Sequence, residues 1–412
     1  MTKYILLLCG FAVAAGGVSD PALHVAAIQD RGTLTSEQAL ELARNNSPEL
    51  RAARLDTQAT EQAVAAAGRW KNPNLNFKAE GVGGDLDGFD GTEYEIVLKQ
   101  TFERGGKRKH DRAVAERSIG VAFQAEAEKE MALLAEVRLA FIEVFAQQEI
   151  GNVRAEQEQL GRAFVEVAKR RHDTGGGSEL EVLQAELAFE EILLSQTCCF
   201  GDLKAARVEL ASLIGIAEET LPELEGEYYD LQTMQDMEIG DHPALKQLNA
   251  RIEVMQAQAS RAKARDAADV TLGAGYKYEA AEDVNTFVLT ASMPLNFVRA
   301  GKAGQSSVLT QVEALQAGRE ELRRKMQQEL SMLTAIYGGA KMEAEMTRDK
   351  LMPKAEQAYG LSRAGYDAGR FSWFELINAQ HHLADIRIRH IESLRDAHLA
   401  RAQISKFMKK GI

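Results

Sequence analysis

The sequence repeats itself at an interval of about 195 residues, and this duplication limits the possible folds more than any other feature. Residues 47–50 (SPEL) return as residues 242–245 (HPAL), an offset of 195 (242 − 47). Residues 106–107 (GK) return as residues 301–302 at the same offset. The modules of solenoid proteins repeat every 20 to 50 residues or so, and a period of about 195 is that of a whole structural unit. We therefore predict two copies of one domain-sized unit.

The sequence pattern of each copy predicts a mainly α fold with a small β part, in which a short helix, a β-hairpin, a long helix and a return helix follow one another. Apolar residues recur at steps of three and four in both long segments, which is the period of an amphipathic helix. Pro353 is expected to kink the second long helix, because proline cannot donate the helical hydrogen bond. The expected domains are a first repeat over 18–213 (helix 48–70, hairpin 74–102, long helix 105–172, return helix 179–213), a linker over 214–241, and a second repeat over 242–412 (helix 243–265, hairpin 270–295, long helix 302–366, return helix 371–408).

Both hairpins alternate polar and apolar residues with a period of two, which indicates strands with two different faces. In the first hairpin, Leu75 and Phe77 alternate with Asn76 and Lys78. This division suits the wall of an outer-membrane barrel, with lipid on one side and water on the other. Because the smallest such barrels have about eight strands, several chains must share one barrel, and three copies would supply about 12 strands. The alternative is two soluble hairpins packed on a helical layer.

Composition excludes several classes of protein. Asp and Glu number 61 against 49 Lys and Arg, and the formal net charge of −12 argues against a nucleic-acid-binding face. No internal apolar run reaches the roughly 18 residues that a membrane-spanning helix needs. His382, His390 and His398 are spaced by eight residues and do not form one ligand set on a helix, and no catalytic constellation stands out. We therefore predict no enzyme activity, no cofactor and no metal site.

The N-terminus is typical of a secretory signal peptide. Lys3 precedes apolar residues 4–15 and small residues follow, so residues 1–17 are expected to be removed on export. The alternative is an apolar start to a soluble protein. Two adjacent cysteines remain, Cys198 and Cys199, and they are expected to be free thiols because adjacent cysteines form only a strained disulfide ring. A metal-capturing pair is the alternative.

Four segments of the sequence carry a recognisable pattern: 34–50 (LTxxQALxxAxxNxPxL), 100–108 (QTFERGGKR), 351–355 (LxPxA) and 365–380 (GYxxGxxSxxELIxAQ). Each segment is loose alone, but in this order and duplicated they are specific. Together they resemble the TolC family of outer-membrane efflux channels, over roughly residues 34–408. They are also similar to the branch of this family that serves heavy-metal cation pumps (CzcC-like).

This resemblance implies a homotrimer. Its 12-stranded β-barrel, built from four strands per chain, would lie in the outer membrane and continue as an α-barrel of long helices into the periplasm. The linker over 214–241 and the termini would form an equatorial belt. The implied partners are a periplasmic adaptor (membrane fusion) protein, an inner-membrane efflux pump of the RND type, and outer-membrane lipid. The chain would be a passive conduit, and the heavy-metal branch implies metal cations as its cargo.

Each long helix is expected to reverse at a glycine-containing turn, and the two turns correspond in the duplication. Glycine permits the left-handed backbone that ends a helix, and serine can cap the next helix, so turn formation alone explains these residues. The resemblance also implies that the turns form the periplasmic tip where the adaptor docks. The docking residues implied in this way are Thr174, Gly175, Gly176, Ser178, Gly369, Arg370 and Ser372.

Asp173 and Asp367 precede these turns at an offset of 194 (367 − 173). In a trimer they would place six carboxylates near the tip, which would favour cations at a narrow aperture. The alternative role is to solvate the last helical turn, although acids are unfavourable at a helix C-terminus. We predict that both carboxylates line the aperture.

Two other functions fit parts of the sequence. A type I protein-secretion channel shares the fold and differs in the pump with which it assembles. A soluble coiled-coil scaffold belongs to a different class and has no pore. The alternating strands and the signal peptide argue against the scaffold.

Overall fold

The computed structural model describes residues 32–82, 91–226, 228–231, 242–295 and 300–407. The expected signal peptide, the tip of the first hairpin and part of the linker (227 and 232–241) lie outside these residues. The chain divides into two compact units, and each contains parts of both sequence repeats. The first unit comprises residues 1–47, 133–232 and 336–402, and the second comprises residues 48–132, 233–335 and 403–412.

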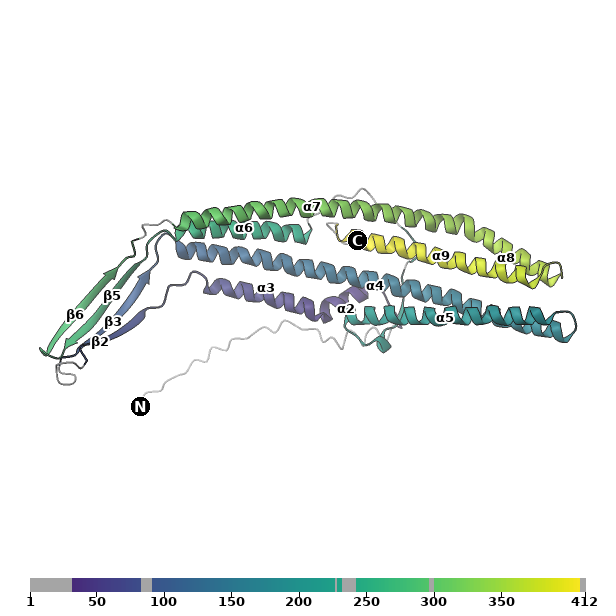
Figure 1. The fold of residues 1–412 in the computed structure, drawn as a ribbon, viewed down its shortest axis with the longest axis horizontal. Helices are drawn as coiled ribbons and strands as arrows, with labels where there is room; N and C mark the ends of the chain where they lie inside the picture. Colours follow the sequence, from purple (N-terminus) through teal and green to yellow (C-terminus); the bar gives the residue numbers. More distant parts are fainter. Residues whose placement is uncertain (1–31, 83–90, 227, 232–241, 296–299, 408–412) are drawn as a thin grey trace, which may run out of the picture. The chain divides into compact units, whose positions relative to one another are not determined.

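Helices dominate both units and the strands are few, which confirms the predicted fold class (Figure 1). Among the described residues, no helix is both long enough and apolar enough to cross a lipid bilayer. The helices are α2 (Ser36–Asn46), α3 (Pro48–Ala66), α4 (Lys107–Asp173), α5 (Glu179–Ile214), α6 (Pro243–Ala264), α7 (Ala300–Met346), α8 (Met352–Asp367) and α9 (Trp373–Ser405), with a 3-10 turn at Glu218–Thr220 and a π turn at Thr347–Leu351. The strands are β1 (Thr33–Leu34), β2 (Asn74–Glu80), β3 (Glu93–Phe102), β4 (Glu223–Leu224), β5 (Val270–Glu279) and β6 (Val284–Ser292).

In the first unit, one core cluster lies between α4 and α5. Val137, Phe141 and Val144 follow one another on α4 at steps of four and three, and they are buried with Leu210 and Ile214 of α5. Each of these side chains contributes roughly 1.5–3 kcal/mol by leaving water. The helical period read from the sequence therefore marks a real buried face.

A short parallel pairing ties the start of the described chain to the linker. β1 pairs with β4, so that Thr33 lies opposite Glu223 and Leu34 opposite Leu224. Thr35 then caps α2, because its hydroxyl accepts from the backbone N–H of Gln38 at 3.4 Å, while its own N–H donates to the Gln38 side chain at 2.9 Å. Two-residue strands have no periodicity to detect, and the sequence did not predict this pairing.

The second long helix is interrupted just before Pro353. Thr347–Leu351 forms a π turn, and the N–H of Met352 donates to the carbonyl of Thr347, five residues earlier. A π turn inserts one extra residue and changes which carbonyls need a donor, which lets the chain accommodate a proline that has no N–H. The helix continues as α8 to Asp367.

The second unit contains a four-stranded antiparallel sheet in the order β2-β3-β5-β6 (Figure 1). The two hairpins, one from each sequence repeat, join through β3 and β5, which pair over all ten residues of each strand from Glu93↔Glu279 to Phe102↔Val270. β2 and β6 lie at the two edges of the sheet. The strands predicted from alternation are all present, at nearly the predicted positions.

Candidate functional site

The sheet of the second unit has one apolar face, and that face is exposed. In the row formed by Phe77, Ile96, Tyr276 and Phe287, the exposed fractions are 66%, 47%, 45% and 90%. A monomeric protein in water rarely exposes a continuous apolar patch of this kind. This face therefore requires cover by lipid or by protein. The neighbouring row consists of Leu75, Leu98, Ala274 and Leu289.

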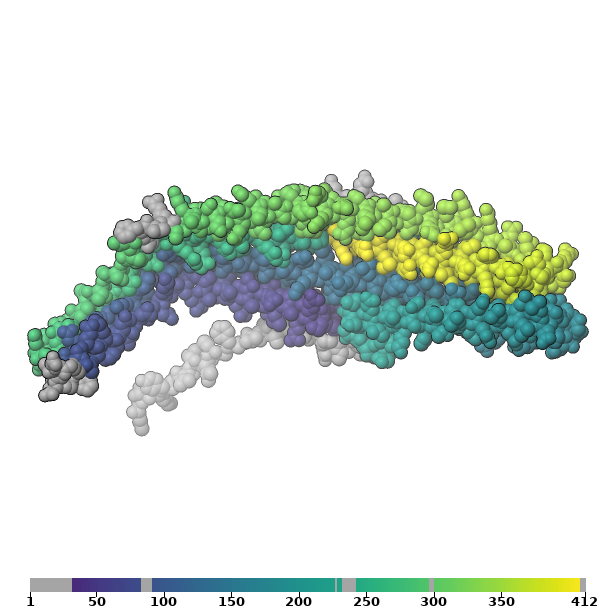
Figure 2. All heavy atoms as spheres, viewed as in Figure 1, coloured from purple at the N-terminus to yellow at the C-terminus, as the bar shows by residue number. Residues whose placement is uncertain are grey.

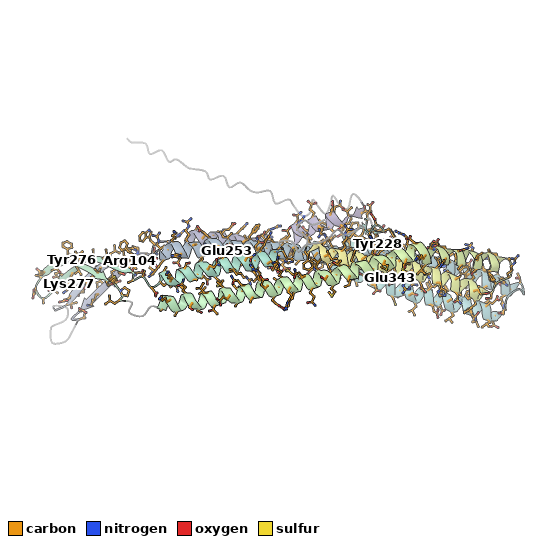
Figure 3. All side chains as sticks on the ribbon, turned by 90° about the horizontal axis from the view of Figure 1, so that it is seen from above. Arg104, Tyr228, Glu253, Tyr276, Lys277 and Glu343 are labelled. Carbon is orange, nitrogen blue, oxygen red and sulfur yellow. The ribbon has the colours of Figure 1, made fainter. Side chains whose placement is uncertain are left out.

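The opposite face of the sheet is polar and charged. Lys277 Nζ lies 2.7 Å from a carboxylate oxygen of Glu93 and 2.8 Å from one of Glu279. Figure 3 labels Lys277 beside Tyr276, its neighbour on β5 that belongs to the apolar face. One polar row across the strands consists of Lys78, Glu95, Lys277 and Thr286. The sheet thus has one apolar face and one polar, charged face.

The sheet is incomplete as it stands. In the described part of the chain, β2 and β6 each pair with one neighbouring strand only. Unpaired N–H and C=O groups along a strand cannot face lipid, because each would lose a hydrogen bond without replacement. A sheet with these two faces needs further strands at both edges.

The first of the two glycine-containing turns predicted to form the adaptor-docking tip joins α4 to α5. Gly175 has a φ of +76°, and Gly176 N–H donates to the carbonyl of Arg171 at 2.8 Å. The Thr174 hydroxyl donates to the carbonyl of Arg170 at 3.0 Å. Ser178 begins α5, since its hydroxyl accepts from the backbone N–H of Glu181 at 3.2 Å. The turn has the geometry that the sequence predicted.

The second turn joins α8 to α9. Gly369 has a φ of +70°, and Arg370 N–H donates to the carbonyl of Gly365 at 2.8 Å. Ser372 and Glu375 form a reciprocal cap: Ser372 N–H donates to Glu375 at 2.7 Å, and Glu375 N–H donates to the Ser372 hydroxyl at 3.3 Å. The backbone N–H and the hydroxyl of Ser372 hold the pKa of Glu375 below its usual range.

The structure brings the two turns together within the first unit. Trp373 and Tyr366, which flank the second turn, are buried in one cluster with Ala168 of α4 and Ala185 of α5. The guanidinium of Arg171 lies over the Tyr366 ring at 5.1 Å. Figure 2 shows α5 in teal beside α9 in yellow in this part of the unit. Residues about 190 positions apart thus form one surface, as the duplication implied.

Asp173 and Asp367 are both exposed. Among the described residues, neither carboxylate takes part in an ion pair with a basic side chain. They are therefore available to water and ions. Their role in an aperture stays a prediction.

A stripe of exposed leucines on α5 was missed by the sequence analysis. Leu180, Leu183, Leu187 and Leu194 follow one another at steps of three, four and seven, and they are 62%, 56%, 59% and 68% exposed. This spacing is that of a coiled-coil seam. Within the described residues, the structure leaves this apolar stripe uncovered on the surface of α5.

The remaining candidate groups do not assemble into a chemical site. Cys198 and Cys199 are free thiols, and the described residues contain no group of three His, Cys, Asp or Glu side chains able to hold a metal ion. His398 contacts the backbone of the linker, with Nε2 2.7 Å from the Tyr228 carbonyl. Burial is the main reason that its pKa lies below the usual value. This histidine therefore holds the linker against α9.

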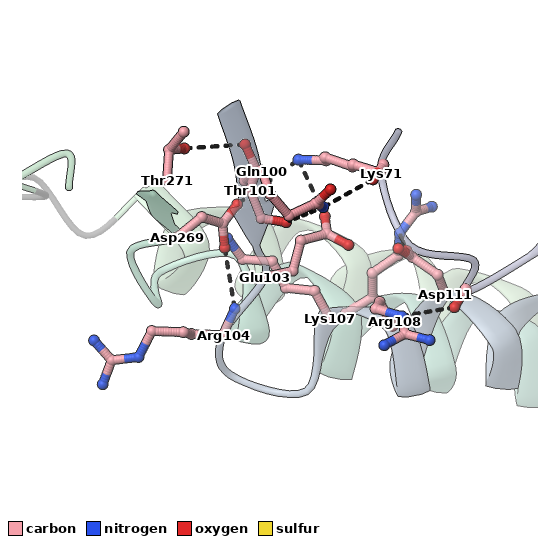
Figure 4. Close-up of polar contacts among 12 residues, drawn as sticks. Lys71, Gln100, Thr101, Glu103, Arg104, Lys107, Arg108, Asp111, Asp269 and Thr271 are labelled. Atoms are coloured by element: carbon pink, nitrogen blue, oxygen red, sulfur yellow. Dashed lines mark hydrogen bonds and ion pairs between the residues drawn. The ribbon is translucent and has the colours of Figure 1, made fainter. Parts of the chain in front are cut away.

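A polar network links the strands of the second unit to its helices (Figure 4). The Asp269 carboxylate, just before β5, lies 2.6 Å from Lys107 Nζ at the start of α4 and 3.8 Å from Lys71 Nζ. The backbone N–H of Arg104 also donates to Asp269, at 3.2 Å. Partial burial raises the pKa of Asp269, but these donors outweigh it and hold the value below the usual range. The network fixes the exit of β3 against the entry of β5.

A sheet with one lipid-compatible face and open edges, continued by long amphipathic helices, defines the class of outer-membrane channel proteins. The chain belongs to the outer membrane efflux protein family, whose model matches residues 39–216 and 236–408. This confirms the resemblance to the TolC family of channels, and it favours a channel over a soluble scaffold.

Individual proteins agree with this assignment. The chain is 24% identical to the cobalt-zinc-cadmium resistance protein CzcC of Cupriavidus metallidurans over 404 residues, which cover 97% of this chain and 95% of that protein. It shares its fold with a membrane protein from Pseudomonas aeruginosa, with a TM-score of 0.74, 17% identity, and coverage of 90% of this chain and 92% of that one. The structure of CusC is similar too, with a TM-score of 0.73, 15% identity and coverage of 90% of both chains.

Proposed function

We propose that three copies of this chain form one outer-membrane channel that extends into the periplasm, and that the channel is a passive conduit. The observation that supports this most directly is the sheet, which has an exposed apolar face and two unpaired edges. Three four-stranded sheets placed edge to edge would close a barrel of about 12 strands with no free edge. The charged face with Lys277 would then line a water-filled interior.

The exposed leucine stripe supports the same assembly in the helical part. Leu183 and Leu187 lie on a part of α5 that would stand in water, where an apolar seam needs a protein partner. We assign this seam to the contact between neighbouring chains. Symmetric copies supply such a contact without any further gene product.

We propose that the two glycine turns dock a periplasmic adaptor, which connects the channel to an inner-membrane pump of the RND type. The turns are exposed at Thr174, Gly175, Gly369 and Arg370, while Trp373 behind them is buried, so they present a preorganised surface. Preformed surfaces bind with a smaller entropic cost. Asp173 and Asp367 would line the aperture beside them.

We infer that the cargo is a heavy-metal cation. The support comes from the relative CzcC, which is named for resistance to cobalt, zinc and cadmium. Exposed carboxylates at Asp173 and Asp367 suit the passage of cations.

Cysteine cross-linking tests the shared barrel. In a variant whose natural cysteines are replaced by serine, Asn76→Cys on β2 is combined with Val288→Cys or Thr290→Cys on β6. Oxidation is expected to give a ladder that ends at three chains. A ladder that ends at two, or cross-links only within one chain, refutes the trimeric barrel.

The matched control places both cysteines on strands that already pair within one chain. Gln100→Cys with Leu272→Cys joins β3 to β5, where the two residues are direct partners. This pair is expected to cross-link without forming a ladder. Purified trimers are then added to planar bilayers, where stepwise conductance is expected from a channel.

A further inference from the structure

We propose that a hollow at the end of α3 binds the phosphate of a phospholipid headgroup. The hollow has a volume of about 550 Å³, which is within the usual range for ligand sites. It lies within the second unit, between the end of α3 and the first turns of α4. The lining residues that matter here are Glu61, Gly68, Arg69, Trp70, Arg108 and Arg112.

Gly68 builds the floor of this hollow. It has a φ of +68°, which ends α3 near Ala66, four residues before the predicted end. A Cβ at this position would lie 2.6 Å from the carbonyl oxygen of Arg108, so only glycine allows this close approach. The Gly68 carbonyl in turn accepts a hydrogen bond from Arg108 Nε at 2.8 Å. Arg69 and Trp70 are thereby held against α4.

Three arginines supply positive charge to the hollow. The Nε atoms of Arg69 and Arg108 each donate a hydrogen bond to a backbone carbonyl at 2.8 Å. These bonds do not use the two terminal nitrogens of either guanidinium group. Among the described residues, neither forms an ion pair with a carboxylate. Arg112 pairs with Glu116 at 2.9 Å, and Glu61 is the one acidic residue of the lining. Guanidinium groups bind phosphate oxygens through paired hydrogen bonds.

This charge is unusual for the protein. The chain has a formal net charge of −12. The lining of the hollow nevertheless contains three arginines against one glutamate. A local excess of positive charge on an acidic protein attracts an anion to this place in preference to the rest of the surface.

The neighbouring aromatic residues place the hollow at the edge of the apolar face. The Arg108 guanidinium lies 4.1 Å from the centre of the Trp70 ring. Trp70 meets Phe102 edge to face at 5.9 Å, and Phe102 is the last residue of β3, on the same face as Ile96. Trp70 is 56% exposed. Tryptophan beside arginine, where an apolar surface ends, is typical of the membrane interface.

These observations favour a phospholipid over a free anion. A phospholipid can place its phosphate among the arginines and its acyl chains along the apolar face that begins at Phe102. A free phosphate would use only the arginines. The inference rests on the proposed membrane position of the sheet, because only that position brings headgroups to this level.

The two tryptophans of the chain permit a direct measurement. Trp373 is buried in the first unit, and Trp373→Phe leaves Trp70 as the single fluorophore at the hollow. The full-length protein, in a non-ionic detergent and stripped of lipid, is titrated with dihexanoyl phosphatidylglycerol. Parallel titrations use inorganic phosphate and dihexanoylglycerol, which has the acyl chains but no phosphate.

We expect saturable quenching or a wavelength shift with the phospholipid, and at least tenfold weaker responses with the other two probes. Arg69→Gln with Arg108→Gln is expected to weaken binding roughly 25-fold, at about fivefold for each basic residue near a lipid surface. The matched control, Arg324→Gln with Lys325→Gln, removes the same charge from α7 and is expected to leave the affinity unchanged. Both control residues are exposed.

Each other outcome overturns the proposal in a distinct way. Equal binding of inorganic phosphate and phospholipid shows a simple anion site. Equal binding of dihexanoylglycerol shows an apolar surface that does not recognise phosphate. An unchanged affinity in the double arginine variant, with native circular dichroism, shows that Arg69 and Arg108 do not bind the phosphate. The same samples are tested for conductance: pores without lipid binding refute this site alone, whereas the absence of trimers and pores refutes the proposed channel.

Discussion

Replacing Phe287 by arginine tests whether the apolar face of the sheet meets lipid. Phe287 is 90% exposed in the isolated chain and lies in the middle of β6. In water, a substitution at such an exposed position changes stability by no more than about 0.5 kcal/mol. In a bilayer, an arginine near the midplane costs roughly 2–4 kcal/mol. Loss of a buried phenylalanine adds about 2 kcal/mol.

The expected destabilisation is therefore about 4–6 kcal/mol per chain in a membrane, and close to zero in water. The matched control is Thr286→Arg, one residue earlier on the same strand and on the polar face. An arginine there would face the aqueous interior and is expected to cost less than about 1 kcal/mol, as for other water-exposed positions. The contrast between adjacent residues removes effects of expression and overall charge.

Both variants are refolded into phospholipid vesicles. Fluorescence then gives the urea concentration at half unfolding, and electrophoresis shows how much protein migrates as a heat-resistant trimer. Phe287→Arg is expected to give little or no inserted trimer, whereas Thr286→Arg inserts like the unchanged protein. Equal insertion of both variants would refute the assignment of this face to lipid. The reverse order would show that the sheet is inside out.

Three further perturbations test the tip, the linker and a packed turn. Asp173→Asn with Asp367→Asn is expected to lower the cation preference of single channels severalfold, measured from reversal potentials in a salt gradient, and unchanged selectivity contradicts the aperture role. Because burial keeps the pKa of His398 below its usual 6.5, its stabilising effect is complete above that pH and is lost as the pH falls towards the folded-state pKa. The rate of proteolysis of the linker is therefore expected to rise as the pH falls below 6.5. The rise is expected to be smaller in His398→Gln, and in the control His382→Gln it is expected to equal that of the unchanged protein. In Gly365→Ala the added methyl group would overlap the Phe371 ring in the second turn, and the variant is expected to lose about 1–3 kcal/mol of stability in thermal unfolding.

Much of the fold could be predicted from the sequence, because its signals are periodic. The alternation of Phe77 with Lys78 fixed both the strand and the difference between its faces. The steps of three and four through Val137 and Phe141 marked a face that is buried in the structure. Glycine and serine at the turns had local geometric roles, and the structure shows those roles at Gly175 and Ser178.

Other features depend on contacts that no period reveals. Leu183 on α5 has the same spacing as a core residue, so the sequence could not tell that its own chain leaves it uncovered. Trp70 and Arg108 meet only because Gly68 turns the backbone out of the helix, and a run of helix-forming residues before it hid that turn. Asp269 and Lys107 form an ion pair because β3 and β5, one from each repeat, are paired in the sheet.

The uncovered surfaces together decide what kind of assembly the chain needs. Lipid can cover Phe287 and its row, but lipid cannot satisfy the free edges of β2 and β6, which need backbone partners. The leucine stripe with Leu183 would stand in water, so it needs protein. An unrelated partner would have to supply both matching strands and a matching helical seam. A second copy already possesses an edge of each kind, because β2 and β6 of an alternating four-stranded sheet run in opposite directions and can pair antiparallel with each other. Closed symmetry among identical chains is therefore the arrangement that covers all three surfaces with the fewest components.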